Sequence, residues 1–386
     1  MVKVGRILRD HREAGAFNSL IALWGFVDEG TFLTKSGHVG VVYQLRGQEA
    51  EGLTHAQRRT IVHQFEAALR LLDEHCRVYQ YLLKQTVERF VVPPCRRAVA
   101  QEALQGRTDY LNERRHELYR IDHFLVLLHE TPAPVRATSL GRAWRAPGDA
   151  LRRWLSTDQT CTLLESVLDR AIGTLHHKAS AVEVQLADCG LRRLNRSEAF
   201  RFFRRLINYD AATMTASSLA YDTYLDYFVA DSAVECHRDR LVVGQQSVKV
   251  LSMKEPPGQT FAHILGDLVA LPGEFIACLE WQRSPIDRVR RDIQSRRRHF
   301  FNKRVSLINY VSSDTRPDEM LVDDSAGATV RQLGDALTEI EVNGHFFGVC
   351  SLTLVLHGPE FRALEATAAE AMKVLAAHDG SAFDES

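Results

Sequence analysis

The sequence contains no Gly-Lys dipeptide, which excludes a phosphate-binding loop of the G-x-x-x-x-G-K-[ST] type. It also lacks the G-x-S-x-G, H-E-x-x-H and G-x-G-x-x-G patterns of common hydrolase, zinc-protease and dinucleotide sites. We therefore expect no catalytic residue, no nucleotide-binding residue, no metal ligand and no cofactor in this chain.

Long apolar runs are missing as well. No stretch approaches the roughly 20 apolar residues that span a bilayer. The longest early run, Leu20 to Val27, is closed by Asp28 and Glu29. The preceding residues, Val2 to Ala16, have the pattern of a short amphipathic helix. This arm is either a surface flap or a segment that docks to a membrane surface or a membrane-protein partner.

Neither sign of charge is in excess, and cysteine pairs are absent. The 48 Lys and Arg residues balance 49 Asp and Glu residues, so any binding to nucleic acid or anionic lipid must be local. The seven cysteines are odd in number and form no C-x-x-C pair. This pattern argues against a disulfide framework and a zinc site, and it fits a reducing cytoplasm.

Histidine is the most abundant candidate ligand, with 16 residues. The adjacent pair His176-His177 lies on a predicted helix, where neighbours point about 100° apart and make a poor metal site. His123 and His129 lie six residues apart on a predicted strand and face the same side of it. The apolar residues around them favour a core role over catalysis.

Alternating extended and helical patterns predict an α+β (mixed α/β) fold in which β-sheets are covered by helices. We expect two sub-domains, 1–208 and 209–386, and an exposed excursion over 130–158 that is rich in proline and glycine. Trp144 and Trp154 either pack this excursion down or form a patch for a partner. The expected strands cover 31–34, 39–46, 78–87, 121–129, 275–281 and 344–356, with a hairpin over 235–251. The expected helices cover 53–75, 95–118, 161–186, 197–207, 261–271, 285–305, 318–341 and 359–377.

The strongest charge feature is the predicted helix that contains Arg288 to Arg304. Apolar residues at helical spacing (Ile286, Val289, Ile293 and Phe300) make it amphipathic. Its basic face is either solvated and paired with acidic groups elsewhere, or it contacts nucleic-acid phosphates or anionic headgroups. The candidate contact residues are Arg290, Arg291, Arg296, Arg297, Arg298, Lys303 and Arg304.

One compact segment, Lys249 to Gln282, combines a β-prone run, the breaker Pro256-Pro257-Gly258, a short helical pattern and a second strand ending near Trp281. This "LSxKxPP" turn with a following "LP" and a Trp-ending strand resembles the amino-terminal domain of type IV secretion and conjugal-transfer ATPases of the TrbE/CagE type, the fourth VirB component. The resemblance implies a structural role for five motif residues, Lys254, Glu255, Pro256, Pro257 and Trp281. Lys254-Glu255 forms either a turn contact or a contact to a motor domain.

The resemblance continues along most of the chain. The turn Lys35-Ser36-Gly37, the strand Val39 to Tyr43 and the sequence Arg46-Gly47-Gln48-Glu49 are similar to the early strand pair of the family. Phe300-Phe301, the late strand at Phe346 to Leu356 and the region Asp379 to Glu385 follow in the order seen in the family.

The resemblance also implies a function. The members of this family are oligomeric cytoplasmic ATPases, peripheral to the bacterial inner membrane, that energise pilus assembly and substrate transfer. We accordingly expect a scaffold and docking domain whose partners are other type IV secretion subunits, its cognate ATPase domain and further copies of itself. Without a P-loop this chain is expected not to hydrolyse ATP, and ATP and Mg²⁺ are expected only with the motor domain. The alternative is a free-standing module that binds nucleic acid or a membrane surface through the basic helix 288–304.

Overall fold

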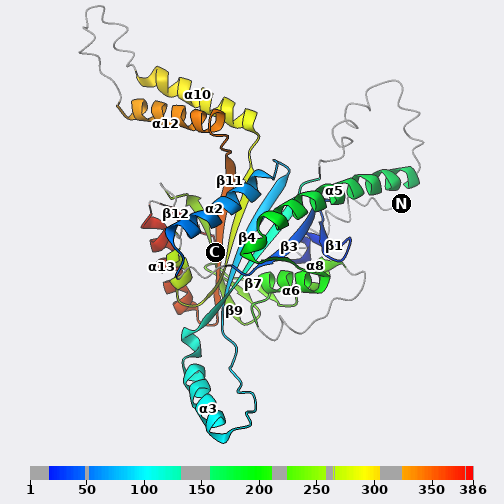
Figure 1. Cartoon of the computed structure of the whole chain (residues 1–386), viewed down its shortest axis with the longest axis vertical. Helices are drawn as coiled ribbons and strands as arrows, with labels where there is room; N and C mark the ends of the chain where they lie inside the picture. The colour runs from blue at the N-terminus through cyan, green and yellow to red at the C-terminus, as the bar shows by residue number, and fades with distance from the viewer. Residues whose placement is uncertain are drawn as a thin grey trace, which may run out of the picture. The chain divides into compact units, whose positions relative to one another are not determined.

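In the computed structural model, the residues with a described structure are 17–47, 52–131, 157–210, 224–257, 264, 266–304, 324–378 and 380–385 (Figure 1). The predicted arm Val2 to Ala16 lies outside them. So do most of the predicted excursion, with Trp144 and Trp154, and the glycine of the Pro-Pro-Gly turn. The side chains of Lys303 and Arg304 also lie outside the described part.

The first predicted hairpin is confirmed. Strands β2 (Thr31–Thr34) and β3 (Val39–Leu45) pair antiparallel around Gly37, which has a φ of 84°. Helix α2 (His55–Arg70) is capped by Thr54, whose hydroxyl accepts from the backbone N–H of Gln57 in a capping box. The helix ends at Arg70, earlier than the predicted residue 75.

The remaining elements of residues 76–207 also follow the predicted pattern. Strands β4 (Cys76–Thr86) and β5 (Tyr119–His129) enclose helix α3 (Ala98–Glu113) and the 3-10 turn η2 (Arg115–Glu117). Helices α5 (Thr157–Gln185) and α6 (Arg196–Ile207) follow. The sequence analysis missed strands β1 (Leu23–Phe26) and β6 (Leu191–Arg193), and it missed β12 (Ser381–Asp384) near the other end.

The predicted 235–251 hairpin turns at Gly244, with a φ of 63°. The hairpin consists of β8 (Leu241–Val243) and β9 (Gln246–Glu255), and β7 (Val234–Cys236) precedes it. Strand β9 extends four residues past the predicted end. Short helix α9 (Gly266–Ala270) precedes strand β10 (Glu274–Arg283). Strand β11 (Gly348–Gly358) and helix α13 (Phe361–Ala376) complete the order.

The described strands form one 12-stranded sheet, which confirms the α+β class. Its order is β1-β2-β3-β5-β4-β10-β11-β9-β8-β7, with β6 beside β3 and β12 beside β9. Contacts divide the chain into two units, one of residues 1–71, 76–280 and 350–386 and the other of residues 72–75 and 281–349. The predicted division after residue 208 stays a prediction.

The two faces of the sheet in the first unit carry different helices, because neighbouring residues on a strand point to opposite sides. Tyr43 on β3 donates from its hydroxyl to Glu183 on α5 at 2.8 Å. Phe124 on β5 instead packs on Phe202 of α6, with ring centroids 4.7 Å apart. A second apolar core joins β9, β10 and β11 to α13, through Phe275, Leu352, Leu354, Leu356, Leu364, Ala368, Ala371 and Leu375.

The second unit contains a pair of contacting helices, α10 (Ile286–Arg304) and α12 (Asp324–Glu341). On α10 Ile293 is buried and Val289 and Phe300 are partly buried, as the amphipathic pattern predicts. Ile286, the fourth residue of the predicted stripe, is exposed, so the buried stripe begins one turn later.

Candidate docking site

The first unit carries an apolar groove with a volume of about 430 Å³. It lies between helix α6, one face of strands β2, β4 and β5, and the segment that contains the 3-10 turn η1 (Phe17–Ser19) and the start of β1. Threonine and tyrosine hydroxyls are its only polar side-chain groups among the described residues. The lining residues are Phe17, Leu20, Ile21, Ala22, Leu23, Phe32, Thr34, Tyr79, Tyr81, Val126, Leu128, Phe202, Phe203, Leu206 and Ile207.

Helix α6 is positioned by its first turn. Asn195 caps it through a hydrogen bond from the Glu198 backbone N–H, and the Glu198 carboxylate accepts from the Asn195 backbone N–H. Arg192 on β6 holds the same carboxylate with two contacts of 2.9 Å. Asn195 thus fixes the first turn of α6, whose apolar face packs on the sheet.

Aromatic contacts form the floor of the groove. Phe202 meets Tyr81 edge-on at a centroid distance of 5.4 Å, and Phe203 meets Phe32 in the same way at 5.1 Å. Gly40 leaves the space that Phe32 occupies, since a Cβ on Gly40 would lie 2.4 Å from that ring. Any larger residue at position 40 would therefore displace one wall of the groove.

Burial keeps the tyrosine hydroxyls of the groove neutral. It raises the pKa of Tyr81 well above its ordinary value and also raises that of Tyr79. Both hydroxyls already have partners within the fold, Arg77 for Tyr79 and Cys278 for Tyr81, so the groove offers a bound chain mainly apolar contacts. The chemistry of the groove is therefore that of a binding surface.

Exposed aromatic residues lie beside the groove, on β1 and around helix α8 (Leu225–Phe228). The rings of Trp24 and Tyr224 pack edge-on with centroids 5.0 Å apart, and both are about half exposed. Tyr227 and Phe228 are also exposed, as is Leu20 on the groove itself. Apolar surface of this kind is typical of an interaction site.

Lys35, from the predicted turn, ties these segments together. Its ammonium group lies 2.8 Å from Asp226 on α8 and donates to the backbone carbonyl of Asn18 at 2.7 Å. Asp226 is buried, whereas Lys35 is exposed, so only the carboxylate end of the pair is shielded from solvent. The turn that resembles the family motif thus fixes the rim of the groove.

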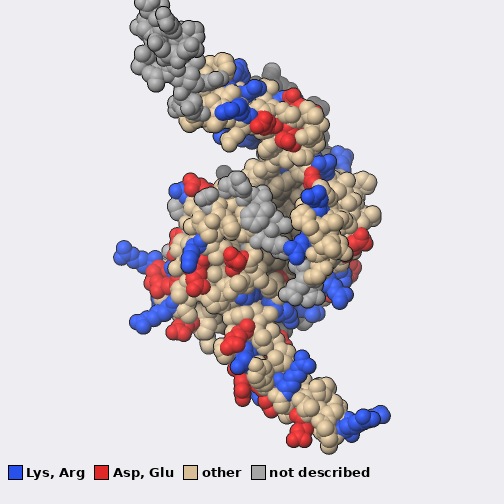
Figure 2. All heavy atoms as spheres, turned by 60° about the vertical axis from the view of Figure 1, so that its left-hand side comes forward, with Lys and Arg blue, Asp and Glu red and all other residues tan. Residues whose placement is uncertain are grey.

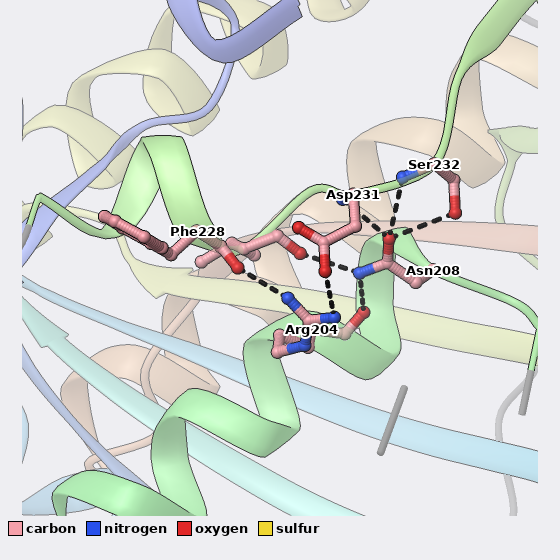
Figure 3. A network of polar contacts seen from close by, with 6 residues as sticks. Arg204, Asn208, Phe228, Asp231 and Ser232 are labelled. Atoms are coloured by element: carbon pink, nitrogen blue, oxygen red, sulfur yellow. Dashed lines mark hydrogen bonds and ion pairs between the residues drawn. The ribbon is translucent and has the colours of Figure 1, made fainter. Parts of the chain in front are cut away.

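A buried polar network holds α6 to the chain after α8 (Figure 3). Arg204 is fully buried and donates to the Phe228 carbonyl at 2.6 Å and to Asp231 at 2.5 Å. The Asn208 amide donates to the carbonyls of Arg204 and Val229, at 3.0 and 2.7 Å. Its oxygen accepts from the backbone N–H groups of Asp231 and Ser232 and from the Ser232 hydroxyl, at 3.0, 3.3 and 3.2 Å.

The predicted core histidines are placed by the sheet. His123 lies 2.8 Å from the Gln80 side chain, and burial lowers its pKa to about 4. His129 is buried beside the Cys76 sulfur, with Nδ1 and Sγ 3.9 Å apart. His176 contacts Thr31 and Arg193 on neighbouring strands, at 2.9 and 3.1 Å. These contacts fix the three imidazole rings where the sheet packs with α5.

Four of the five motif residues lie at the end of β9, and Trp281 lies on β10. Lys254 and Glu255 are exposed, and Glu255 accepts from the Ser381 hydroxyl of β12 at 3.0 Å. Pro256 and Pro257 follow directly. In the second unit, Trp281 packs edge-on against Phe346 at 5.8 Å, and a Cβ on Gly348 would lie 2.4 Å from its indole nitrogen. The roles predicted for these residues remain predictions.

The predicted basic residues lie along α10 in the second unit. Arg290 contacts Asp287 at 3.6 Å and Glu341 on α12 at 3.4 Å, and Arg291 donates to the Asp287 carbonyl. Arg296, Arg297 and Arg298 are exposed, one turn further along the helix.

No pattern in the sequence predicted the groove. Its residues come from 17–34, 79–81, 126–128 and 202–207, and no motif joins these segments. The available signals were the alternating Tyr79 and Tyr81 and the aromatic pair Phe202-Phe203.

Residues 30–137 match the family described as type IV secretion system ATPase VirB4/TrbE, N-terminal domain. None of the curated proteins matches the chain. Among the described residues no helix has the length and apolar character to cross a membrane. The matched region contributes the hairpin β2 and β3 and strands β4 and β5, and thus most of the sheet face beneath the groove.

Proposed function

We propose, from the match of residues 30–137 to the N-terminal domain of the VirB4/TrbE family of type IV secretion ATPases, that the chain is a docking domain for other subunits of the secretion system. The observation that carries the proposal is the apolar groove of about 430 Å³. It opens beside exposed aromatic residues, on the sheet that the family domain builds. A surface of this kind binds an apolar segment of another protein.

The proposed partners are inner-membrane subunits of the same secretion system. Such subunits carry apolar helical segments, and the groove presents apolar side chains with neutral hydroxyls, which suit that chemistry. We place the chain in the cytoplasm, peripheral to the bacterial inner membrane. Self-association and contact with the cognate ATPase domain complete the proposed partners.

Energising pilus assembly and substrate transfer requires the motor domain of the family, which supplies ATP hydrolysis. The 386 residues contain no Gly-Lys dipeptide on which a P-loop could be built. We propose that this chain contributes docking and scaffolding to that process. Purified alone, it should release no phosphate from ATP above the buffer control.

Co-purification tests the docking role. The full chain is co-expressed with separately tagged inner-membrane subunits of its own secretion system and captured in detergent. Leu20→Asp places a charge on an exposed residue of the groove and should reduce capture at least 10-fold. Val184→Asp is the matched control, because Val184 is 80% exposed on α5, on the opposite side of the sheet from α6. Equal capture of wild type and both variants would overturn the proposal.

A further inference from the structure

Four residues of helix α10 line a hollow of about 340 Å³ in the second unit. They are Gln294, Arg297, Arg298 and Phe301, at positions i, i+3, i+4 and i+7, so they share one face of the helix. Phe301 is 59% exposed, which is unusual for an aromatic ring on a helix that buries another stripe. The hollow thus combines two guanidinium groups, a carboxamide and an open aromatic face.

The charges on α10 differ between its two halves. In the first half, Arg288 and Arg290 pair with acidic residues of the same helix, Asp292 at 4.0 Å and Asp287 at 3.6 Å. In the second half, no carboxylate of the described residues forms an ion pair with Arg297 or Arg298. Within the described part of the chain, the positive charge at the hollow therefore has no acidic ion-pair partner.

Helix α12 limits the width of this basic surface. The Arg297 guanidinium lies over α12, 3.6 Å from the position of a Cβ on Gly334. Further along, α12 carries the acidic residues Asp335, Glu339 and Glu341. Figure 2 shows basic and acidic side chains in separate groups on these helices. The last of these acidic residues, Glu341, contacts Arg290 in the first half of α10, away from the hollow.

We propose that Gln294, Arg297, Arg298 and Phe301 bind single-stranded nucleic acid. Guanidinium groups bind phosphate through paired hydrogen bonds, and an exposed aromatic ring stacks on an unpaired base. The carboxamide can donate to a base edge or to the backbone. This site is independent of the docking role, because it lies in the other unit and shares no residue with the groove.

The geometry favours one strand over a duplex and over a lipid surface. The bases of a duplex are paired and stacked on one another, so they cannot stack on the Phe301 ring, whereas an unpaired base can. Anionic headgroups would use the two guanidinium groups, but the exposed ring and the carboxamide match a base and its backbone more closely. A single strand uses all the groups of the hollow at once.

Fluorescence anisotropy with the full chain tests the site. The probes are a fluorescein-labelled 20-nucleotide oligo-dT, a 20-base-pair duplex and vesicles of phosphatidylcholine with phosphatidylglycerol. Arg297→Gln with Arg298→Gln should weaken oligo-dT binding at least 10-fold and reduce the salt slope by about 1.4, since each phosphate contact on a single strand contributes about 0.7. Phe301→Ala should weaken binding about 5- to 100-fold at an unchanged salt slope, the effect of losing one stacked base.

The matched control is Arg288→Gln with Arg291→Gln, which removes the same charge from the same helix outside the hollow. It should change oligo-dT binding less than 3-fold, and circular dichroism should show equal helix content in all variants. Three results would overturn the proposal. These are no oligo-dT binding at 50 mM salt, equal weakening by the control pair, and tighter binding of the duplex or the vesicles than of oligo-dT.

Discussion

Lys249 and Asp384 form an ion pair 2.7 Å long that joins strand β9 to strand β12. Lys249 opens the motif segment and is largely buried. At the other end of β12, the Ser381 hydroxyl donates to Glu255. The short strand is therefore fixed at both ends to the strand that leads into the Pro-Pro turn.

Replacing Asp384 with Asn should lower the free energy of unfolding by about 1–3 kcal/mol, because the buried Lys249 ammonium loses its charged partner. Urea unfolding measures the loss, and hydrogen exchange should show faster exchange at 381–385. Asp239→Asn is the control, since Asp239 pairs with Arg240 on the surface at 3.6 Å and such pairs contribute below about 1 kcal/mol. Equal losses in the two variants would contradict the structural role of the Lys249 pair.

Lys84→Met should destabilise the first unit by about 2–3 kcal/mol. The Lys84 ammonium is buried, donates to the backbone carbonyls of Val269 and Leu271, and lies 4.1 Å from the centre of the Tyr119 ring. Loss of the ammonium group leaves the Val269 and Leu271 carbonyls without this hydrogen-bond donor. Thermal unfolding monitors the effect, and Lys373→Met on the exposed side of α13 should stay within about 0.5 kcal/mol of wild type.

Asn208→Ala should cost about 3 kcal/mol, because one side chain satisfies backbone groups of α6 and of the segment after α8. Ser232→Ala should cost only about 0.5–1 kcal/mol, since the Asn208 oxygen keeps its two backbone donors. Chemical denaturation of both variants gives the comparison. A larger loss for Ser232→Ala would mean that the hydroxyl, and not the amide, organises the network.

The stability of the fold should fall on acidification through His357. Its ring is buried against Tyr209 at 4.5 Å, and burial lowers its pKa to about 4, although Glu274 and Asp210 act in the opposite direction. The unfolded chain takes up the proton first, so this contribution is complete above pH 6.5 and is lost as the pH falls towards 4.

The free energy of unfolding at pH 7.5 and at pH 4.5 tests the contribution of His357. The His357→Gln variant should lose less stability than wild type over that interval, by on the order of 3 kcal/mol. The exposed His237 gives the control, and His237→Gln should follow the wild-type curve. An unchanged pH dependence in His357→Gln would show that other groups carry the acid sensitivity.

Gly348→Ala should disturb the second unit. A Cβ there would lie 2.4 Å from the Trp281 indole nitrogen and 2.7 Å from the Gln282 carbonyl, so Trp281 must move. We expect a loss of about 2 kcal/mol and a red shift of tryptophan emission. Gly358→Ala on the same strand meets open space and should leave both readouts unchanged.

Local patterns in the sequence predicted most helices and long strands. Thr54 and Asn195 mark helix starts through short-range hydrogen bonds, and Gly37 and Gly244 mark turns through positive φ angles. These signals act within a few residues of the chain, so a single sequence contains them.

Strand partners and the groove depend on residues far apart in the sequence. Nothing near Cys76–Thr86 indicates that β10 lies beside it, and the three-residue strand β6 has too few positions for a periodic pattern. The groove combines side chains from η1, four strands and α6, and the sheet order brings these elements together. The order of strands in the sheet therefore determines the groove, and local sequence patterns do not reveal it.

The position of β10 next to β4 also has a consequence for synthesis and folding. Residues 30–137 hold β4, but its second neighbour begins at Glu274, almost 190 residues after β4 ends. Until the ribosome has delivered that segment, the nascent chain has an unpaired edge with a row of free amides and carbonyls. A fragment that ends at residue 137 should accordingly aggregate in proportion to its concentration, whereas the longer chain protects this edge by itself.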